Sequence, residues 1–179
     1  MEQSAFIDAF RRILTKNGLE VFTGEETTAK FFALTGRMLE VNAYMNLTAI
    51  TDMEGIILKH YADSLTAARY LPEGASVIDI GCGAGFPSLP LAIVRPDVCI
   101  TALDSTAKRI NYIRETAEIL GLNNITCIAA RAEELACDPV YREQFDIFIM
   151  LRNVCHVDIS DCSASDDADS DLAHTEFLL

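Results

Sequence analysis

Three glycines at alternate positions are the feature of this chain that most directly indicates chemistry. Gly81, Gly83 and Gly85 follow a short apolar segment at residues 76–80, and a second apolar run at 89–94 is typical of a helix. A strand, a glycine turn and a helix in this order let the backbone of an α/β domain approach a nucleoside closely. Glycine also tolerates the left-handed dihedrals of such a turn. We therefore expect side chains at these positions to fill space that a ligand needs.

The spacing of the glycines distinguishes between kinds of cofactor. A dinucleotide fingerprint reads G-x-G-x-x-G, whereas here the third glycine comes one position earlier and Phe86-Pro87 follows it. The G-x-G-x-G spacing, with Asp79 in the preceding strand, resembles the first motif of Rossmann-like methyltransferases. A tight turn that binds no ligand is the alternative for this motif taken alone.

A carboxylate at the end of the next apolar segment supports the ligand-binding interpretation. Asp104 follows residues 98–103 and comes about 20 residues after the glycines, where a nucleotide-binding βαβ unit places an acid on the ribose hydroxyls. A carboxylate can accept hydrogen bonds from both hydroxyls. The alternative is that Asp104 caps a helix beginning near Thr106.

A third apolar segment, residues 124–130, precedes Arg131-Ala132-Glu133-Glu134. In methyltransferases of this type the loop after the third strand brackets the adenine. Taken alone, this segment would be an ordinary solvated helix start, with acids placed favourably for the helix dipole.

The span from Tyr44 to Asp146 resembles one family, the ribosomal RNA small-subunit methyltransferase G family, also called glucose-inhibited division protein B. Its members methylate guanine N7 in 16S rRNA. The matching segments are Met45–Ile50, Lys59-His60, Asp63–Leu65, Ile78–Pro87, Leu89–Ile93, Leu103–Ser105, Lys108-Arg109 and Arg131–Glu134.

The resemblance implies S-adenosylmethionine as the cofactor and 16S rRNA or the small ribosomal subunit as the partner. It also implies that Gly81, Phe86, Ala132 and Glu133 contact the cofactor. The complete set of candidate cofactor-binding residues is Gly81, Gly83, Gly85, Phe86, Asp104, Ala132 and Glu133. No catalytic residue is assigned, because guanine N7 carries a lone pair and its methylation needs positioning rather than a base.

These segments predict an α/β fold, a Rossmann-like class I methyltransferase sheet with an N-terminal helical cap, lacking the last strands. We expect the cap at 1–72, an incomplete core at 73–151 and an acidic irregular tail at 152–179. Helical spacing places cap helices around 6–14, 27–43, 55–59 and 63–70, with Thr51 and Glu54 as a capping box. Lys59-His60 forms either a wall of the cofactor or RNA cleft, or a solvent-facing helix end.

Composition limits the class of protein. Half of the 179 residues are hydrophobic, which is typical of a single globular domain. No run approaches the roughly 20 apolar residues of a membrane span, and the first residues lack a secretory pattern. The six cysteines form no C-x-x-C, so we expect a cytoplasmic protein without a disulfide framework. No metal site is expected, because Cys155, His156, Cys162 and His174 match no familiar zinc spacing.

The net charge of −13 has the wrong sign for an RNA-binding protein. Seven acids and no Lys or Arg follow Arg152, so the first 152 residues carry 14 bases against 20 acids. RNA contact would then use local patches, although each could equally be a solubilising helix face. The candidate patches are Arg11-Arg12-Lys16, Lys59-His60, and Lys108-Arg109 with Arg114.

The C-terminal part departs from the family pattern. Residues 144–149 predict a fourth strand, but Leu151 stands where the family has an arginine, and Arg152 comes one place later. We therefore expect a chain that is truncated or frame-shifted near residue 148, with the edge of the fourth strand exposed. Two other functions are open: a catalytically dead cofactor-binding fragment and a small-molecule methyltransferase.

Overall fold

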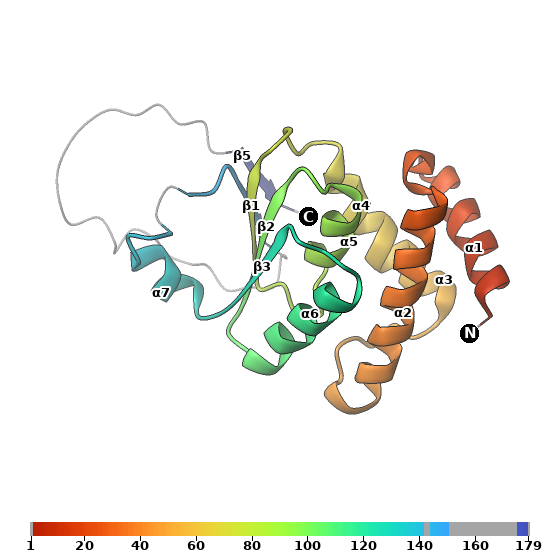
Figure 1. The fold of residues 1–179 in the computed structure, drawn as a ribbon, viewed down its shortest axis with the longest axis horizontal. Helices are drawn as coiled ribbons and strands as arrows, with labels where there is room; N and C mark the ends of the chain where they lie inside the picture. The colour runs from red at the N-terminus through yellow and green to blue at the C-terminus, as the bar shows by residue number, and fades with distance from the viewer. Residues whose placement is uncertain (1, 142–143, 151–174, 179) are drawn as a thin grey trace.

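The computed structural model describes residues 2–141, 144–150 and 175–178, and it consists of a central sheet with helices on both faces and a helical cap (Figure 1). All five strands are parallel, in the order β3-β2-β1-β4-β5. The strands are β1 (Ser76–Ile80), β2 (Cys99–Asp104), β3 (Ile125–Ala129), β4 (Ile147–Met150) and β5 (Thr175–Leu178). This topology confirms the expected Rossmann-like sheet with its first four strands.

The register of the sheet aligns the segments that the sequence singled out. Ile80 pairs with Leu103, and Asp104 pairs with Ala129, so β1, β2 and β3 end side by side. Ligands of open α/β sheets bind outside the carboxyl ends of the strands. The glycine turn, Asp104 and the loop after β3 therefore all lie at the edge where such a ligand would bind.

The expectation that the edge of the fourth strand is exposed was wrong. β5 pairs with β4 in parallel register, with Ile147 opposite Thr175 and Met150 opposite Leu178. A four-residue segment is too short to reveal a strand by periodicity, and its partner is selected by tertiary pairing. Residues 151–174, which hold most of the predicted irregular tail, lie outside the described residues.

Helices cover the two faces of the sheet unequally. α5 (Ser88–Val94) and α6 (Ala107–Ile119) pack on one face together with the cap, and α7 (Ala132–Cys137) lies on the other (Figure 1). Leu135 of α7 is buried against Ile78 and Leu103, which point away from α5 and α6 because strand side chains alternate.

The N-terminal cap consists of α1 (Gln3–Lys16), a short 3₁₀ turn η1 (Glu20–Phe22), α2 (Glu25–Met45), α3 (Met53–Ile56), the π-helical η2 (Ile57–Ala62) and α4 (Asp63–Ala68). Its core is aromatic: the rings of Phe31 and Tyr61 lie 4.7 Å apart, and the Tyr61 hydroxyl is 2.6 Å from that of Thr35. The predicted helices are present, with the last two joined into one continuous segment.

One predicted cap was misplaced. The side chain of Asp52, rather than Thr51, accepts the hydrogen bond from the Gly55 N–H at 2.7 Å and begins α3. Both residue types are good N-caps. The choice depends on where the chain leaves the preceding loop, which the sequence pattern does not specify.

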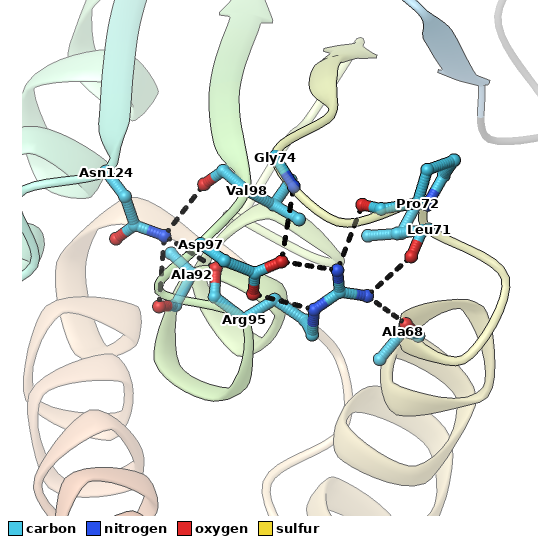
Figure 2. A network of polar contacts seen from close by, with 9 residues as sticks. All are labelled: Ala68, Leu71, Pro72, Gly74, Ala92, Arg95, Asp97, Val98 and Asn124. Atoms are coloured by element: carbon cyan, nitrogen blue, oxygen red, sulfur yellow. Dashed lines mark hydrogen bonds and ion pairs between the residues drawn. The ribbon is translucent and has the colours of Figure 1, made fainter.

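A polar network joins the cap to the core at the amino ends of the strands (Figure 2). The Arg95 guanidinium donates to the carbonyl oxygens of Ala68 and Leu71 at 2.7 Å and of Pro72 at 3.0 Å. It also forms an ion pair with Asp97 at 2.6 Å. The Asn124 amide donates to three carbonyls, that of Ala92 in the last turn of α5 and those of Arg95 and Val98 in the α5–β2 connection. Arg95 therefore satisfies carbonyls at the end of α4 and in the turn that follows it, and it fixes the entry to β1.

We expect Arg95→Ala to lower the free energy of unfolding by about 2–3 kcal/mol, because it leaves two partly buried carbonyl groups, those of Ala68 and Leu71, without this donor. Arg95→Lys should recover little, since one ammonium cannot match the planar fork of the guanidinium. Urea unfolding provides the measurement. Arg12→Ala is the control, because its exposed pair with Glu54 should contribute less than about 1 kcal/mol. Equal effects of the two alanine variants would contradict the assignment.

The cysteines differ from expectation in one respect. Cys82, Cys99 and Cys127 are free thiols, but Cys137 at the end of α7 is disulfide-bonded. The pairing of two cysteines depends on their distance in the fold, which their spacing in the sequence does not give.

Within the described ranges, no helix combines the length and apolar character that crossing a membrane requires.

Candidate functional site

The glycine turn after β1 has the backbone conformation that its composition predicted. Gly81, Gly83 and Gly85 have φ angles of +76°, +56° and +85°. The N–H groups of Gly81 and Cys82 donate to the Leu103 carbonyl at 2.8 and 3.0 Å, which ties the turn to the end of β2. The turn is therefore held against the neighbouring strand before any ligand binds.

The three glycines do not share one role, which corrects our expectation that all of them leave room for a ligand. A Cβ on Gly83 would have the Gly81 carbonyl oxygen at 3.8 Å as its nearest neighbour, so that position faces open space. A Cβ on Gly85 would lie 2.7 Å from Leu89 Cδ1 and 3.2 Å from Ile113 Cγ1. Gly85 is thus required by packing against α5 and α6, because its position faces the core.

Asp104 connects the end of β2 with this turn. Its side chain is almost fully buried, Oδ2 accepts from the Gly83 N–H at 3.1 Å, and Oδ1 accepts from the Thr106 N–H at 2.7 Å. Both interpretations of Asp104 therefore find support: it organises the start of α6, and it lies directly beside the turn. A carboxylate has about four acceptor sites, so capacity remains for the hydroxyls of a ligand.

A pocket of about 570 Å³ opens between the glycine turn and the cap. One wall consists of the turn, and the other consists of the cap. Arg109 of α6 lies at the margin, with a guanidinium nitrogen 3.7 Å from Asp104 Oδ2. The lining residues from the turn are Cys82, Gly83, Ala84, Phe86 and Pro87, and those from the cap are Leu47, Thr48, Lys59, His60, Asp63, Ser64 and Thr66.

His60 joins the two walls. Its ring stacks on Phe86 with the centroids 4.5 Å apart and the planes 2° from parallel, and its Nε2 is 2.9 Å from Thr48 Oγ1. Thr48 is held in turn by Asn42, which exchanges two hydrogen bonds with the Thr48 backbone. Burial lowers the pKa of His60. Of the two interpretations of Lys59-His60, the structure supports the wall of a cleft.

A π-helical segment, η2, contributes two adjacent polar residues to this pocket. π-helical segments are rare and often occur at functional sites. Here Lys59 and His60 of η2 line the pocket together with Asp63, the first residue of α4, and Arg109 approaches it from α6. Lys59 and His60 therefore meet one residue of another predicted basic patch, Arg109, at this pocket, whereas Lys108 and Arg114 are not among its lining residues. The patch of Arg11, Arg12 and Lys16 lies on α1, outside the pocket lining, and Arg12 pairs there with Glu54.

The structure does not bring every candidate residue into this pocket. Gly83 and Phe86 line it, and Gly81, Gly85 and Asp104 belong to the adjoining turn and strand end. Ala132 instead lines a separate apolar pocket of about 170 Å³ between α7 and the ends of β1 and β2, and Glu133 is exposed. Contact of these two residues with a cofactor stays a prediction.

Two acids at the site were not recognised as candidates from the sequence. Asp63 lines the pocket one helical turn after Lys59, a spacing that could have drawn attention to it. Asp79 is fully buried in β1, where one carboxyl oxygen accepts from the Ser88 hydroxyl and the other, Oδ1, has no hydrogen-bond partner among the residues that the structure describes. Burial raises the pKa of Asp79 to about 7.

No cluster of three or more His, Cys, Asp or Glu side chains in the described part of the chain could hold a metal ion. The four residues weighed as zinc ligands, Cys155, His156, Cys162 and His174, lie outside that part. The site therefore consists of a glycine turn, a buried acid and a pocket rimmed by cations.

A known structure shares this architecture. A putative protein-L-isoaspartate O-methyltransferase from Plasmodium falciparum, solved with S-adenosyl-L-homocysteine, matches 81% of this chain and 72% of its own, with a TM-score of 0.50 at 16% sequence identity. A likeness at this identity establishes the fold. The strand order and the turn after β1 define a class I, Rossmann-like methyltransferase fold.

The family follows from the sequence. Residues 27–163 match the model of the family described as rRNA small subunit methyltransferase G, and the chain belongs to this family. The match runs past residue 148, where we expected the chain to depart from the family pattern.

Individual relatives agree with this assignment. A ribosomal RNA small subunit methyltransferase G from Halalkalibacterium halodurans is 41% identical over 155 residues, which are 86% of this chain and 64% of the relative. One from Thermoanaerobacter pseudethanolicus is 44% identical over 143 residues, which are 79% of this chain and 58% of the relative. The chain spans about three fifths of the length of these relatives.

Proposed function

We propose that this chain is the cofactor-binding part of a cytoplasmic, S-adenosylmethionine-dependent methyltransferase that modifies guanine N7 of 16S rRNA. The observation that carries the proposal is the joining of Asp104 to Gly83, which places a buried carboxylate beside a turn with open space. The cofactor would supply an electrophilic methyl group. Family membership supports ribosomal RNA as the substrate class.

In this proposal, different residues contact different parts of the cofactor and of the RNA. Asp104 accepts hydrogen bonds from the ribose hydroxyls of the cofactor, Gly83 leaves room for the cofactor, and Ala132 and Glu133 lie beside its adenine. Lys59 and Arg109 at the pocket rim attract RNA phosphate groups, and such contacts weaken as salt is added. No side chain needs to remove a proton, so the chain contributes by holding the two reactants in line.

The decisive experiment measures tritium transfer from labelled S-adenosylmethionine to small ribosomal subunits that lack this modification. We expect label in 16S rRNA, located at a guanine N7 by the sensitivity of that product to aniline cleavage. Binding of the cofactor without transfer would support the alternative of a catalytically dead fragment. Turnover of a small molecule that is insensitive to salt would support the other alternative.

We expect Asp104→Asn to weaken binding of S-adenosylmethionine by about 1.5–3 kcal/mol, the value of hydrogen bonds to a charged group. Isothermal titration gives the affinity. Asp146→Asn is the matched control, because Asp146 also accepts a backbone N–H, that of Ser76 at 2.8 Å, but lies at the far end of the sheet. Normal affinity with a lowered melting temperature in Asp104→Asn would leave Asp104 a purely structural role.

A further inference from the structure

Asp63, on the cap wall of the pocket, is an acid whose carboxylate makes no hydrogen bond or ion pair with another described residue. The hydroxyls of that wall are engaged: Ser64 donates to the His60 carbonyl, Thr66 donates to the Ala62 carbonyl, and Thr48 bonds His60. Among the described residues, no hydrogen bond or ion pair within 4 Å joins the Asp63 carboxylate to a protein group, although Lys59 lies one turn before it. Asp63 is therefore free to serve a ligand.

The chemistry of that ligand is restricted. An ionised carboxylate only accepts hydrogen bonds, so the ligand group that faces Asp63 must present donors. The rest of the pocket is largely apolar and includes the stacked rings of His60 and Phe86, a surface suited to a flat base. Partial burial raises the pKa of Asp63, and Lys59 offsets part of this effect.

Asp63 lies on the cap wall of the pocket and the glycine turn forms the other wall, so a base between them would present different edges to the two walls. In guanine the N1–H and N2–H donors lie side by side on the Watson–Crick edge, on the opposite side of the purine from N7. A guanine with N7 toward the turn would thus present two adjacent donors to the cap wall. Adenine would instead place its N1 acceptor against the carboxylate.

We propose that Asp63 is the specificity-determining residue of the pocket, and that it accepts hydrogen bonds from N1–H and N2–H of the target guanine. This inference rests on the proposed function, because it takes guanine N7 as the atom that is methylated. Enzymes that act on a base extruded from its stack read it by such contacts to the Watson–Crick edge.

The test compares binding of guanosine and inosine monophosphates to the full chain in the presence of S-adenosylhomocysteine, by NMR titration. Inosine lacks only the N2 amino group. We expect the wild-type chain to prefer the guanosine nucleotide by about fivefold or more and Asp63→Asn to lose most of this preference. Glu54→Gln, which removes an acid of the cap outside the pocket, should retain it.

The outcomes separate this inference from the proposed function. An unchanged guanosine-to-inosine ratio in Asp63→Asn overturns the inference, and so does a wild-type chain without preference. Loss of affinity for S-adenosylhomocysteine in Asp63→Asn, with the ratio intact, would assign Asp63 to the ammonium group of the cofactor instead. Failure of methyl transfer to small subunits would contradict the proposed function, while the nucleotide ratio would still be measured.

Discussion

Replacing Gly85 with alanine will lower the free energy of unfolding by about 3 kcal/mol or more, the sum of backbone strain at positive φ and overpacking. Its Cβ would meet Leu89 and Ile113, which are fully buried and cannot move aside without displacing α5 and α6. The same substitution at Gly83 will cost only about 1–2 kcal/mol, because only the dihedral penalty applies there. Chemical unfolding of both variants measures the difference.

The affinity for S-adenosylmethionine should rank the two variants in the opposite order, with the larger loss in Gly83→Ala. Gly83→Ala will fold but lose at least about tenfold in affinity for S-adenosylmethionine, since about 1.4 kcal/mol of steric cost suffices. The comparison is controlled internally, because the two glycines are two residues apart in the same turn. Unchanged affinity in Gly83→Ala, measured by isothermal titration, would remove the turn from the cofactor site.

The second large effect concerns the buried acid of β1. Asp79 has a pKa near 3.8 when unfolded and about 7 when folded, because burial penalises its charged form. The folded state therefore binds the proton more tightly than the unfolded state. The stability that depends on this proton is complete below pH 3.8 and is lost as the pH rises from there to about 7.

We expect Asp79→Asn to remove this pH dependence, because the amide resembles the protonated acid in shape and does not titrate. Between pH 4 and pH 8 the wild-type chain should lose a few kcal/mol relative to the variant, at about 1.4 kcal/mol for each pKa unit. The free energy of unfolding in urea, measured across this range, gives the difference. Glu54→Gln, which changes an exposed acid, is the control and should follow the pH profile of the wild-type chain. A profile of Asp79→Asn that runs parallel to that of the wild type would show that Asp79 does not cause the pH dependence.

Much of the fold could be predicted because its signals are local. The apolar run of β1 ends at three glycines, and the next strand ends at Asp104, so the order of strand, turn and acid is visible in the chain. The parallel register then follows, since crossover helices join successive strands in one direction. Three of the predicted segments meet at the carboxyl edge for this reason alone.

The sequence by itself therefore determined the class of fold, the family, and the position of the turn and Asp104. The tertiary structure alone decided that Gly85 faces the core while Gly83 faces open space, because that difference depends on where Leu89 and Ile113 pack. It also decided that β5 covers the edge of β4, and that Asp63, directly after the π-helical η2, lines the pocket. Such contacts join residues far apart in the chain or depend on an irregular helix, and neither leaves a periodic pattern in the sequence.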